Sequence, residues 1–127
     1  MKVHEYQAKA ILSEFGIPVP GGRVASTPQE AREIAQELGG SAVIKAQVHA
    51  GGRGLAGGVK RVGSPQEAER AAQDILGHRL VTHQTGPQGI PVNLVLVEEA
   101  VQVSREYYLA VAIDSGARCP VVMASEA

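Results

Sequence analysis

The stretch KAQVHAGGRGLAGGVKRV, residues 45–62, places five glycines and four cationic side chains in one short segment. Glycines let main-chain N–H groups approach an anion closely, and the lysines and arginines around them supply positive charge. This combination is typical of a phosphate-binding cradle. A mobile hairpin tip with solvated basic residues has the same composition, and the residue types alone do not separate the two interpretations.

The spacing of these glycines excludes two well-known phosphate motifs. No Lys-Ser or Lys-Thr pair follows them, as G-x-x-x-x-G-K-S/T requires, and they lead into VKRV, a strand pattern, where a dinucleotide fingerprint needs a helix. What remains is a glycine-rich connection between two strands, with Lys45 on the first and Lys60 and Arg61 on the second. The pattern predicts a β-hairpin that closes over phosphate as a lid.

Charged residues within or at the ends of apolar strands form a second group of candidates. Lys45 interrupts the strand pattern AVIKAQ, and because a buried unpaired ammonium is costly, it should face a phosphate, a structural carboxylate or solvent. Glu98 and Glu99 end an apolar strand, and Glu106 follows a short polar link. These carboxylates could accept hydrogen bonds from ribose hydroxyls or bind a metal, although the pattern alone favours a solvated strand end.

His49 stands directly before the glycines. A histidine beside an anion site could be phosphorylated, or could act as an acid or base near neutral pH. The alternative, which we favour, is a hydrogen-bonded structural histidine that holds the loop. The remaining histidines, His4, His78 and His83, share no metal-ligand spacing.

Hydrophobic periodicity predicts three helices that position these residues. The first spans residues 4–15 and has an apolar face that includes Phe15. The other two begin alike, in STPQEAREIAQELGG and GSPQEAERAAQDILG. Each has a Ser or Thr cap, a proline at the first helical position and a glutamate three residues after the cap. Gly39 and Gly77 are expected to end these helices.

β-Branched runs bounded by Gly, Pro or Ser predict strands at residues 41–48, 58–62 and 92–101. REYYLAVAID and PVVMAS, joined by SGARC, predict an antiparallel hairpin, whereas the connector HRLVTHQTGPQGIP has no regular pattern. The resulting order of elements predicts a mixed α/β arrangement. Because an apolar edge strand needs cover, its place at the end of the sequence indicates a piece of a longer protein or half of an assembly.

The composition excludes several classes of function. A formal net charge of −1 gives no overall attraction to nucleic acid or to an anionic membrane. The single cysteine, Cys119, excludes an intrachain disulfide, and we expect a buried, inert thiol in a reducing compartment. The N-terminus has no apolar signal core, and the longest apolar run, LVLV, is too short to span a bilayer. We therefore expect a soluble, cytoplasmic protein with no nucleic-acid or membrane partner.

Five separated segments resemble one family, in register and in order. VHEYQAKAIL, VIKAQVHAGGRGLAGGVK, GHRLVTHQT, LVEEA and REYYLAV are similar to the β subunit of succinyl-CoA synthetase, the ADP- or GDP-forming succinate–CoA ligase. The similarity covers essentially all 127 residues. Because that family's β subunit is considerably longer, the resemblance implies that residues 1–127 are the N-terminal part of its ATP-grasp nucleotide-binding domain, without the rest of that domain or the CoA-ligase domain.

The resemblance implies an ATP-grasp fold of the α/β (α+β) class, with a mixed sheet, flanking helices and a glycine-rich phosphate lid. In that family the lysine of the IKAQ strand contacts nucleotide phosphate, the GRG segment closes over the phosphates, and the link between two subdomains holds base and ribose. The corresponding nucleotide-binding residues are Lys45, Gly52, Arg53, Gly54, Glu98, Val101 and Glu106. Val101 stands where some relatives carry a more polar residue, a change that a main-chain contact tolerates.

The family joins succinate to CoA at the expense of ATP or GTP, through a phosphohistidine and succinyl-phosphate, in the citric acid cycle. The reactive histidine belongs to the α subunit, so the resemblance removes His49 from the catalytic candidates and implies no catalytic residue within this sequence. The implied partner is that α subunit, in a heterodimer or heterotetramer. Mg²⁺ accompanies the nucleotide, with its ligands expected beyond Ala127, so residues 1–127 alone should be inactive.

Two alternatives stay open at this point. Nothing in these residues is known to touch the acid, so a related ligase such as a malate–CoA ligase has the same nucleotide-binding segments. A non-catalytic nucleotide-binding or subunit-contact module is the alternative from a different class. The sequence also does not select ATP over GTP, because that choice depends on a few contacts around the linking segment.

Overall fold

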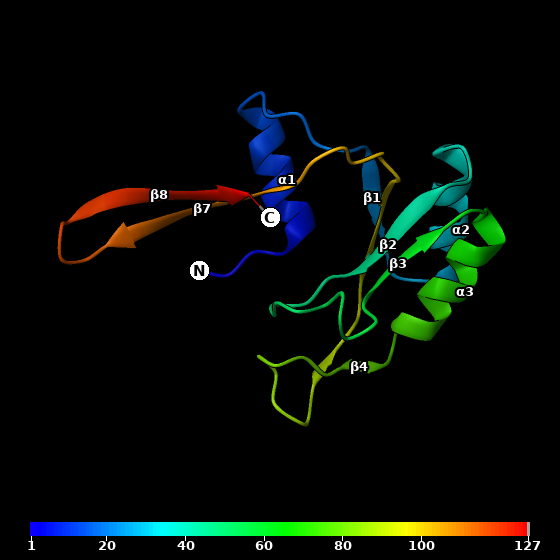
Figure 1. The fold of residues 1–127 in the computed structure, drawn as a ribbon. Helices are drawn as coiled ribbons and strands as arrows, with labels where there is room; N and C mark the ends of the chain where they lie inside the picture. The colour runs from blue at the N-terminus through cyan, green and yellow to red at the C-terminus, as the bar shows by residue number, and fades with distance from the viewer. Residues whose placement is uncertain (127) are drawn as a thin grey trace.

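The structure, a computed structural model, describes residues 1–126 (Figure 1). The helices are α1 (Glu5–Glu14), α2 (Pro28–Glu37) and α3 (Pro65–Ile75). The main sheet contains β1 (Gly22–Ala25), β2 (Ala42–Ala46), β3 (Val59–Val62) and β6 (Val95–Glu99). Two short strands, β4 (Arg79–Leu80) and β5 (Ile90–Pro91), pair separately, as do β7 (Tyr107–Asp114) and β8 (Cys119–Glu126).

The main sheet has the strand order β1-β6-β2-β3, and these neighbours pair antiparallel. β1 and β2 are both antiparallel to β6, so they run parallel to each other with β6 between them. Likewise, β3 and β6 are both antiparallel to β2, so they run parallel to each other with β2 between them. Helices α2 and α3 make the crossovers β1–α2–β2 and β3–α3–β6, so two split strand–helix–strand units interleave. The sequence led us to expect a mixed sheet, but each described pair of neighbouring strands is antiparallel. The reason is that the two parallel strands of one strand–helix–strand unit are separated by a strand of the other unit.

The predicted caps set the starts of α2 and α3. The Thr27 hydroxyl accepts the N–H of Glu30 at 3.2 Å, and the Glu30 carboxylate accepts the N–H of Thr27 at 3.3 Å. At α3, the Ser64 hydroxyl accepts the N–H of Glu67 at 3.2 Å, while the Glu67 carboxylate reaches one residue further back, to the N–H of Gly63 at 2.8 Å. Both arrangements satisfy N–H groups that the helix itself leaves unpaired. The two helices are followed, as predicted, by glycines with positive φ, Gly39 and Gly77.

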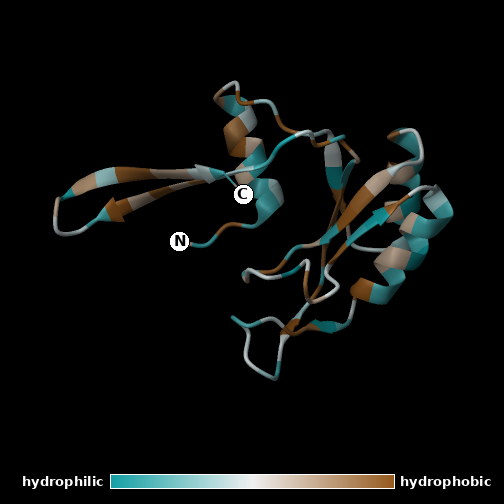
Figure 2. Ribbon diagram, viewed as in Figure 1, coloured by the Kyte–Doolittle hydropathy of each residue, from teal (hydrophilic) through white to brown (hydrophobic). Residues whose placement is uncertain are grey.

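The hydrophobic core lies between the sheet and helices α2 and α3. Residues of β2 alternate between its two faces, and Ala42, Ile44 and Ala46 are fully buried on the helix side. The stripes on α2 and α3 consist largely of alanines, which let the two helices approach each other and the sheet closely. Figure 2 shows hydrophobic, brown residues along β2, with helices α2 and α3, which also carry hydrophilic, teal residues, beside the sheet.

Helix α1 lies on the other face of the sheet. The main-chain N–H of Tyr6 donates to Gln47 Oε1 at 3.2 Å, which ties the start of the helix to the residue after β2. The helix predicted at residues 4–15 is confirmed, but its apolar side chains are not buried: Ile11 and Leu12 are nearly half exposed and Phe15 is 80% exposed. No α1 residue is buried in the core, and hydrogen bonds and ion pairs tie the helix to the sheet.

The β7–β8 hairpin is confirmed and extends away from the main sheet (Figure 1). Its apolar side chains, including Leu109, Val111 and Ile113, are exposed in the part of the chain described. The prediction of a buried thiol is wrong, because Cys119 begins β8 on this exposed hairpin.

The connector between α3 and β6 is more regular than the sequence predicted. Arg79 and Leu80 of β4 pair with Pro91 and Ile90 of β5. The Arg79 guanidinium closes the turn between them by donating to the main-chain oxygens of Gln88, at 2.7 Å, and Gly89, at 2.9 Å. A two-residue ladder is too short to produce an alternating pattern, and this is why sequence periodicity missed it.

Candidate functional site

A cluster of five charged side chains lies between α1 and the sheet. Lys45 Nζ lies 3.1 Å from Glu5 Oε1 and 2.7 Å from Glu98 Oε1. Lys9 pairs with Glu5 at 3.0 Å and also with the other carboxylate oxygen of Glu98. Arg53 Nη2 lies 2.7 Å from Glu5 Oε2. Within this cluster three cations thus face two carboxylates, which leaves one positive charge in excess.

Each element brings its charged residues to this face by its own period. Glu5 and Lys9 are four residues apart on α1 and therefore lie on the same side of the helix. Lys45 alternates with the buried residues of β2 and so points toward α1. Glu98 of β6 is directly opposite Val43 of β2, and opposite residues of an antiparallel pair share a face.

The partners of Lys45 are carboxylates rather than solvent. Burial by itself would lower the pKa of Lys45, but its hydrogen bonds to Glu98 and Glu5 raise the pKa above its ordinary value. Lys45 is therefore a permanent cation. The Glu98 side chain is only 5% exposed, so the interpretation of this residue as a solvated strand end is wrong.

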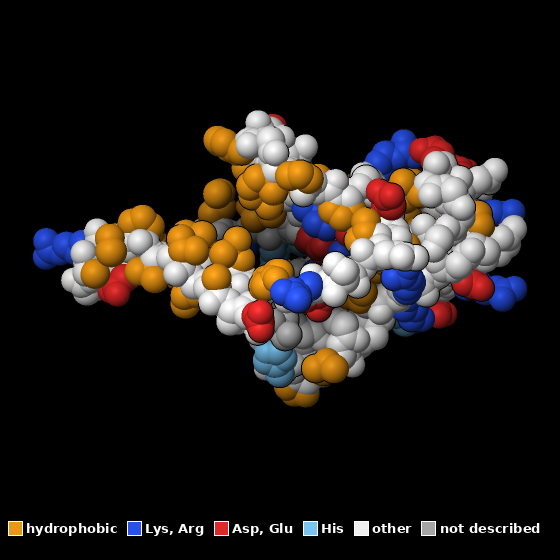
Figure 3. Space-filling model, turned by 45° about the horizontal axis from the view of Figure 1, so that its top comes forward, with side chains coloured by type: hydrophobic (Ala, Val, Ile, Leu, Met, Phe, Trp, Pro, Cys, Tyr) orange, Lys and Arg blue, Asp and Glu red, His pale blue; other side chains and the backbone are white. Residues whose placement is uncertain are grey.

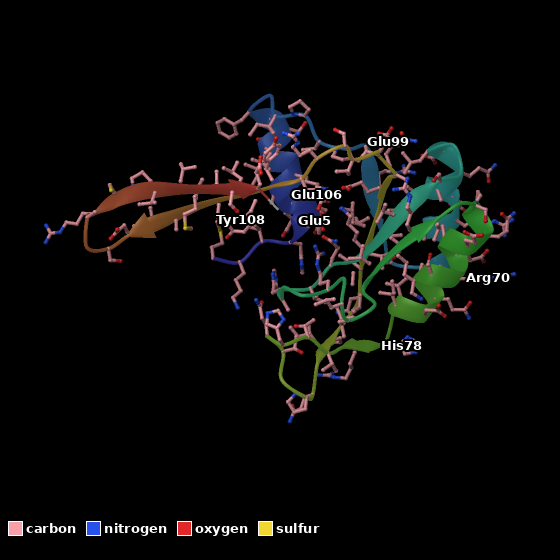
Figure 4. The ribbon with its side chains drawn as sticks, in the orientation of Figure 1. Glu5, Arg70, His78, Glu99, Glu106 and Tyr108 are labelled. Carbon is pink, nitrogen blue, oxygen red and sulfur yellow. The ribbon has the colours of Figure 1, made fainter. Side chains whose placement is uncertain are left out.

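Glu5 is the shared partner of the cations. Burial alone would raise the pKa of Glu5, but hydrogen bonds from Arg53 and Lys9, together with the charge of Lys45, lower the pKa to about 2. The carboxylate therefore stays ionised across the physiological range. One of its oxygens receives both lysines and the other receives the arginine. Figure 4 shows Glu5 at the first turn of α1.

An open cleft of about 680 Å³ lies beside this cluster. We call residues 49–58, between β2 and β3, the glycine loop; Arg53 in this loop and Glu5 on α1 both line the cleft. Arg53 also donates to the main-chain oxygen of Ala46 at 2.6 Å. In Figure 3, acidic and basic side chains gather in a hollow at the centre of the face shown. The antiparallel pairing of β2 with β3 confirms the predicted hairpin.

The glycines of the loop differ in the space that surrounds them. A Cβ at Gly51, Gly52 or Gly58 would lie within 3 Å of a side chain from residues 80–84. Gly54 lines the cleft without positive φ, and a Cβ there would meet no described atom within 4 Å. A side chain at Gly54 would therefore take up space in the cleft without straining the loop.

His49 packs against another histidine at the edge of the cleft. Its ring stacks on that of His4, with centroids 4.0 Å apart and planes inclined by 10°. Burial, followed by the charges of His49 and Arg53, lowers the pKa of His4. These contacts fit the structural role favoured for His49, although ring stacking replaces the hydrogen bond expected from the sequence.

The structure brings most of the predicted nucleotide-binding residues together. Lys45, Arg53 and Glu98 belong to the charge cluster, and Gly52, Arg53 and Gly54 line the cleft. Their contacts with a nucleotide stay a prediction.

The other two predicted residues lie in the segment between β6 and β7. Both Val101 and Glu106 are exposed, and neither belongs to the described lining of the cleft. Figure 4 shows Glu106 just before β7. Their proposed contacts with base and ribose also stay predictions.

Sequence reasoning missed Glu5, Lys9 and Gln84. The pair Glu5 and Lys9, four residues apart, is a recognisable helix signal, but such pairs are usually solvated. Glu5 reaches Lys45 and Arg53 across 40 and 48 residues of sequence, and no local pattern reports such distances. Gln84 accepts the N–H of Gly51 at 2.7 Å from a connector that appeared irregular.

The described residues contain no group of three or more His, Cys, Asp or Glu side chains placed to hold a metal ion. The carboxylates of the charge cluster are already paired with lysines and an arginine, so they do not form a Mg²⁺ site as they stand. None of the helices in residues 1–126 has the length and apolar character that a membrane span needs.

Comparison with known proteins identifies the class to which this fold and site belong. A family model described as an ATP-grasp domain matches residues 2–127, so the chain belongs to the ATP-grasp domain family. The succinate–CoA ligase (ADP-forming) subunit beta of Nitratiruptor sp. is 56% identical over 98% of this chain and 32% of its own length. The same subunit of Geobacter sulfurreducens is 55% identical over 90% of this chain and 30% of its own length.

The resemblance to succinate–CoA ligase β subunits is thereby confirmed, and the chain spans about a third of the length of these relatives. A solved structure supports the fold. The acetyl-coenzyme A synthetase 1 of Ca. Korarchaeum cryptofilum, in complex with coenzyme A, Ca-AMPCP and HgCl⁺, matches 98% of this chain and 53% of its own with a TM-score of 0.78 at 27% identity. The predicted ATP-grasp α/β fold is confirmed.

The low pKa of Glu5 predicts a specific pH dependence of stability. Because the folded-state pKa is about 2 and the ordinary value is 4.5, the stabilisation is present above pH 4.5 and is lost as the pH falls toward 2. We expect Glu5→Gln to flatten the fall in unfolding free energy between these pH values, measured by urea denaturation. Glu14→Gln, on the same helix, serves as the control. Equal slopes in the wild type and in Glu5→Gln would contradict the assignment.

Proposed function

We propose that this chain is the phosphate-binding part of the nucleotide site in the β subunit of a succinate–CoA ligase. The observation that carries the proposal is the convergence of Lys45, from a rigid strand, and Arg53, from the glycine loop, on one carboxylate at the edge of the cleft. A single anionic group therefore already bridges these two cations. A nucleotide phosphate is also an anion, and its oxygens can accept hydrogen bonds from both cations.

Phosphate binding at this position is an exchange of anions. Phosphate oxygens would take the hydrogen bonds that Lys45 and Arg53 now donate to Glu5, and the excess positive charge of the cluster favours the more highly charged anion. Lys9 would keep Glu5 neutralised after the exchange, because its contact at 3.0 Å uses neither Lys45 nor Arg53. Phosphoryl transfer depends mainly on positioning and charge neutralisation, which a strand lysine and a loop arginine supply.

The remainder of the activity is proposed from the relatives. Proteins 55 and 56% identical to this chain are named ADP-forming succinate–CoA ligase subunit beta, which supports an ATP/ADP reaction, CoA as a substrate and a second, α subunit as partner. Mg²⁺ would enter with the nucleotide and neutralise phosphate charge. The described residues offer no ligand set for this ion.

A second candidate is a ligase of this family that uses another acid. The observation in its favour is the structural match to an acetyl-coenzyme A synthetase, since the shared fold does not specify the acid. We expect the complete protein, with its partner subunit, to form the thioester with succinate at much higher kcat/KM than with malate or acetate. CoA-dependent turnover that is equal or faster with either of those acids would overturn the succinate assignment.

Removal of either converging cation should weaken nucleotide binding. A hydrogen bond between charged groups contributes about 1.5–3 kcal/mol, so Lys45→Ala and Arg53→Ala should each raise the Kd for ATP roughly 10- to 100-fold. Isothermal titration of the complete protein measures this change, and circular dichroism verifies folding. Lys60→Ala is the matched control, because Lys60 pairs with Asp74 on α3 outside the described cleft lining. Unchanged affinity in both variants would contradict the proposed site.

Gly54→Ala separates a phosphate site from a merely well-packed loop. No described atom lies within 4 Å of the added Cβ, and φ at Gly54 is not positive, so we expect an unchanged melting temperature. We expect a severalfold rise in the Kd for ATP, because the methyl group projects where main-chain atoms would approach phosphate. A variant with unchanged stability and unchanged affinity would place the nucleotide elsewhere.

A further inference from the structure

We infer that Gln84 is a positioning residue that holds the glycine loop in place independently of Arg53. The inference rests on the proposed function, since it concerns the loop expected to close over phosphate. The Gln84 side-chain oxygen accepts the main-chain N–H of Gly51 at 2.7 Å, across 33 residues of sequence. Gln84 also lines the same cleft as Arg53 and Gly54.

Gln84 is itself held by a compact turn. Thr82 is buried, and its hydroxyl accepts the N–H of Gln84 at 3.1 Å. The Thr85 hydroxyl accepts the N–H of Thr82 at 2.9 Å and donates to the Thr82 carbonyl at 3.1 Å. Leu80, just before this turn, is buried in the hydrophobic core. We call residues 80–85 the loop platform, because the core and these hydrogen bonds fix its shape.

The glycine loop lies against the loop platform at three of its glycines, Gly51, Gly52 and Gly58. A Cβ at Gly51 would be 2.9 Å from Gln84 Nε2, and a Cβ at Gly52 would be 2.8 Å from His83 Nδ1. A Cβ at Gly58 would be 2.8 Å from a methyl group of Leu80. A Cβ at any of these three positions would require the facing platform side chain to shift, so glycine lets the loop lie close against the platform as it stands. Gly54, in contrast, faces open space.

Arg53 is the second tether of the loop, and it is the one that ligand binding would release. Its guanidinium donates to the Ala46 carbonyl and to Glu5, which joins the loop to β2 and α1. A phosphate that takes hydrogen bonds from Arg53 removes part of this tether. The Gln84 contact uses the main chain of Gly51 and no atom of Arg53, so it can persist through the exchange. Gln84 thereby keeps the loop main chain aligned while its arginine changes partners.

Hydrogen exchange of the complete protein without nucleotide tests this inference directly. Gln84→Met removes the acceptor at similar side-chain length, and Gln84→Glu retains an acceptor oxygen. An exposed hydrogen bond of ordinary net strength predicts about fivefold faster exchange in the peptide spanning residues 49–58 for Gln84→Met, and near wild-type exchange for Gln84→Glu. Gln88→Met, on the exposed turn beyond the platform, is the matched control and should leave the peptide unchanged.

The independence of the two tethers has its own readout. In an Arg53→Ala background, Gln84→Met should raise exchange by the same factor as in the wild type, because independent contacts act additively in free energy. We also expect Gln84→Met to raise the Kd for ATP about fivefold, whereas Gln88→Met leaves it unchanged. Unchanged exchange in Gln84→Met, or equal acceleration in Gln84→Glu, would overturn the positioning role. Wild-type protein that binds no nucleotide would overturn the proposed function, while the exchange comparison would still decide the role of Gln84.

Discussion

The carboxylate of Glu5 joins helix α1, strand β2 and the glycine loop through ion pairs. It receives Lys9 from its own helix, Lys45 from β2 and Arg53 from the glycine loop. Three cations so close together would repel one another without an anion between them, and partly buried charges are stable only when they are paired. The low pKa of Glu5 keeps this anion in place at any physiological pH. A phosphate would therefore enter a site in which the cations are already arranged around one anion, the Glu5 carboxylate. The same ion pairs thus contribute to the stability of the fold and to its proposed function.

The two faces of the main sheet serve different purposes. The face covered by α2 and α3 is an aliphatic core whose alanines permit close packing, and β2 contributes three fully buried residues to it. The face toward α1 carries the charge cluster and adjoins the cleft. Because strand residues alternate, one short strand supplies Ile44 to the core and Lys45 to the site. The cation consequently lies on a support whose position the core determines, as charge neutralisation by a fixed group requires.

The glycine loop shows that a phosphate-like composition can have more than one physical cause. Gly51, Gly52 and Gly58 lie close against side chains of the loop platform, and Gly52 also has a φ of +74°, so packing and backbone conformation account for these three glycines. Gly54 has no such neighbour among the described residues and borders the cleft. The exclusion of both well-known glycine motifs by spacing agrees with this arrangement, in which a strand hairpin and a separate platform shape the loop.

The sequence alone determined what depends on neighbouring residues: the three helices, the caps of α2 and α3, the β2–β3 and β7–β8 hairpins and, through its separated motifs, the family. It also singled out Lys45 and Arg53 as candidates for phosphate binding. Periodicity and capping are local, so a sequence reports them. Only the tertiary structure decided that Glu98 is buried, that Cys119 is exposed, and that Glu5 and Gln84 reach the glycine loop. The pairing of β2 with β6 brings Lys45 and Glu98 together across 53 positions, and the connector between α3 and β6 brings Gln84 to Gly51 across 33 positions. Such contacts form only in the folded chain, so no local pattern reports them.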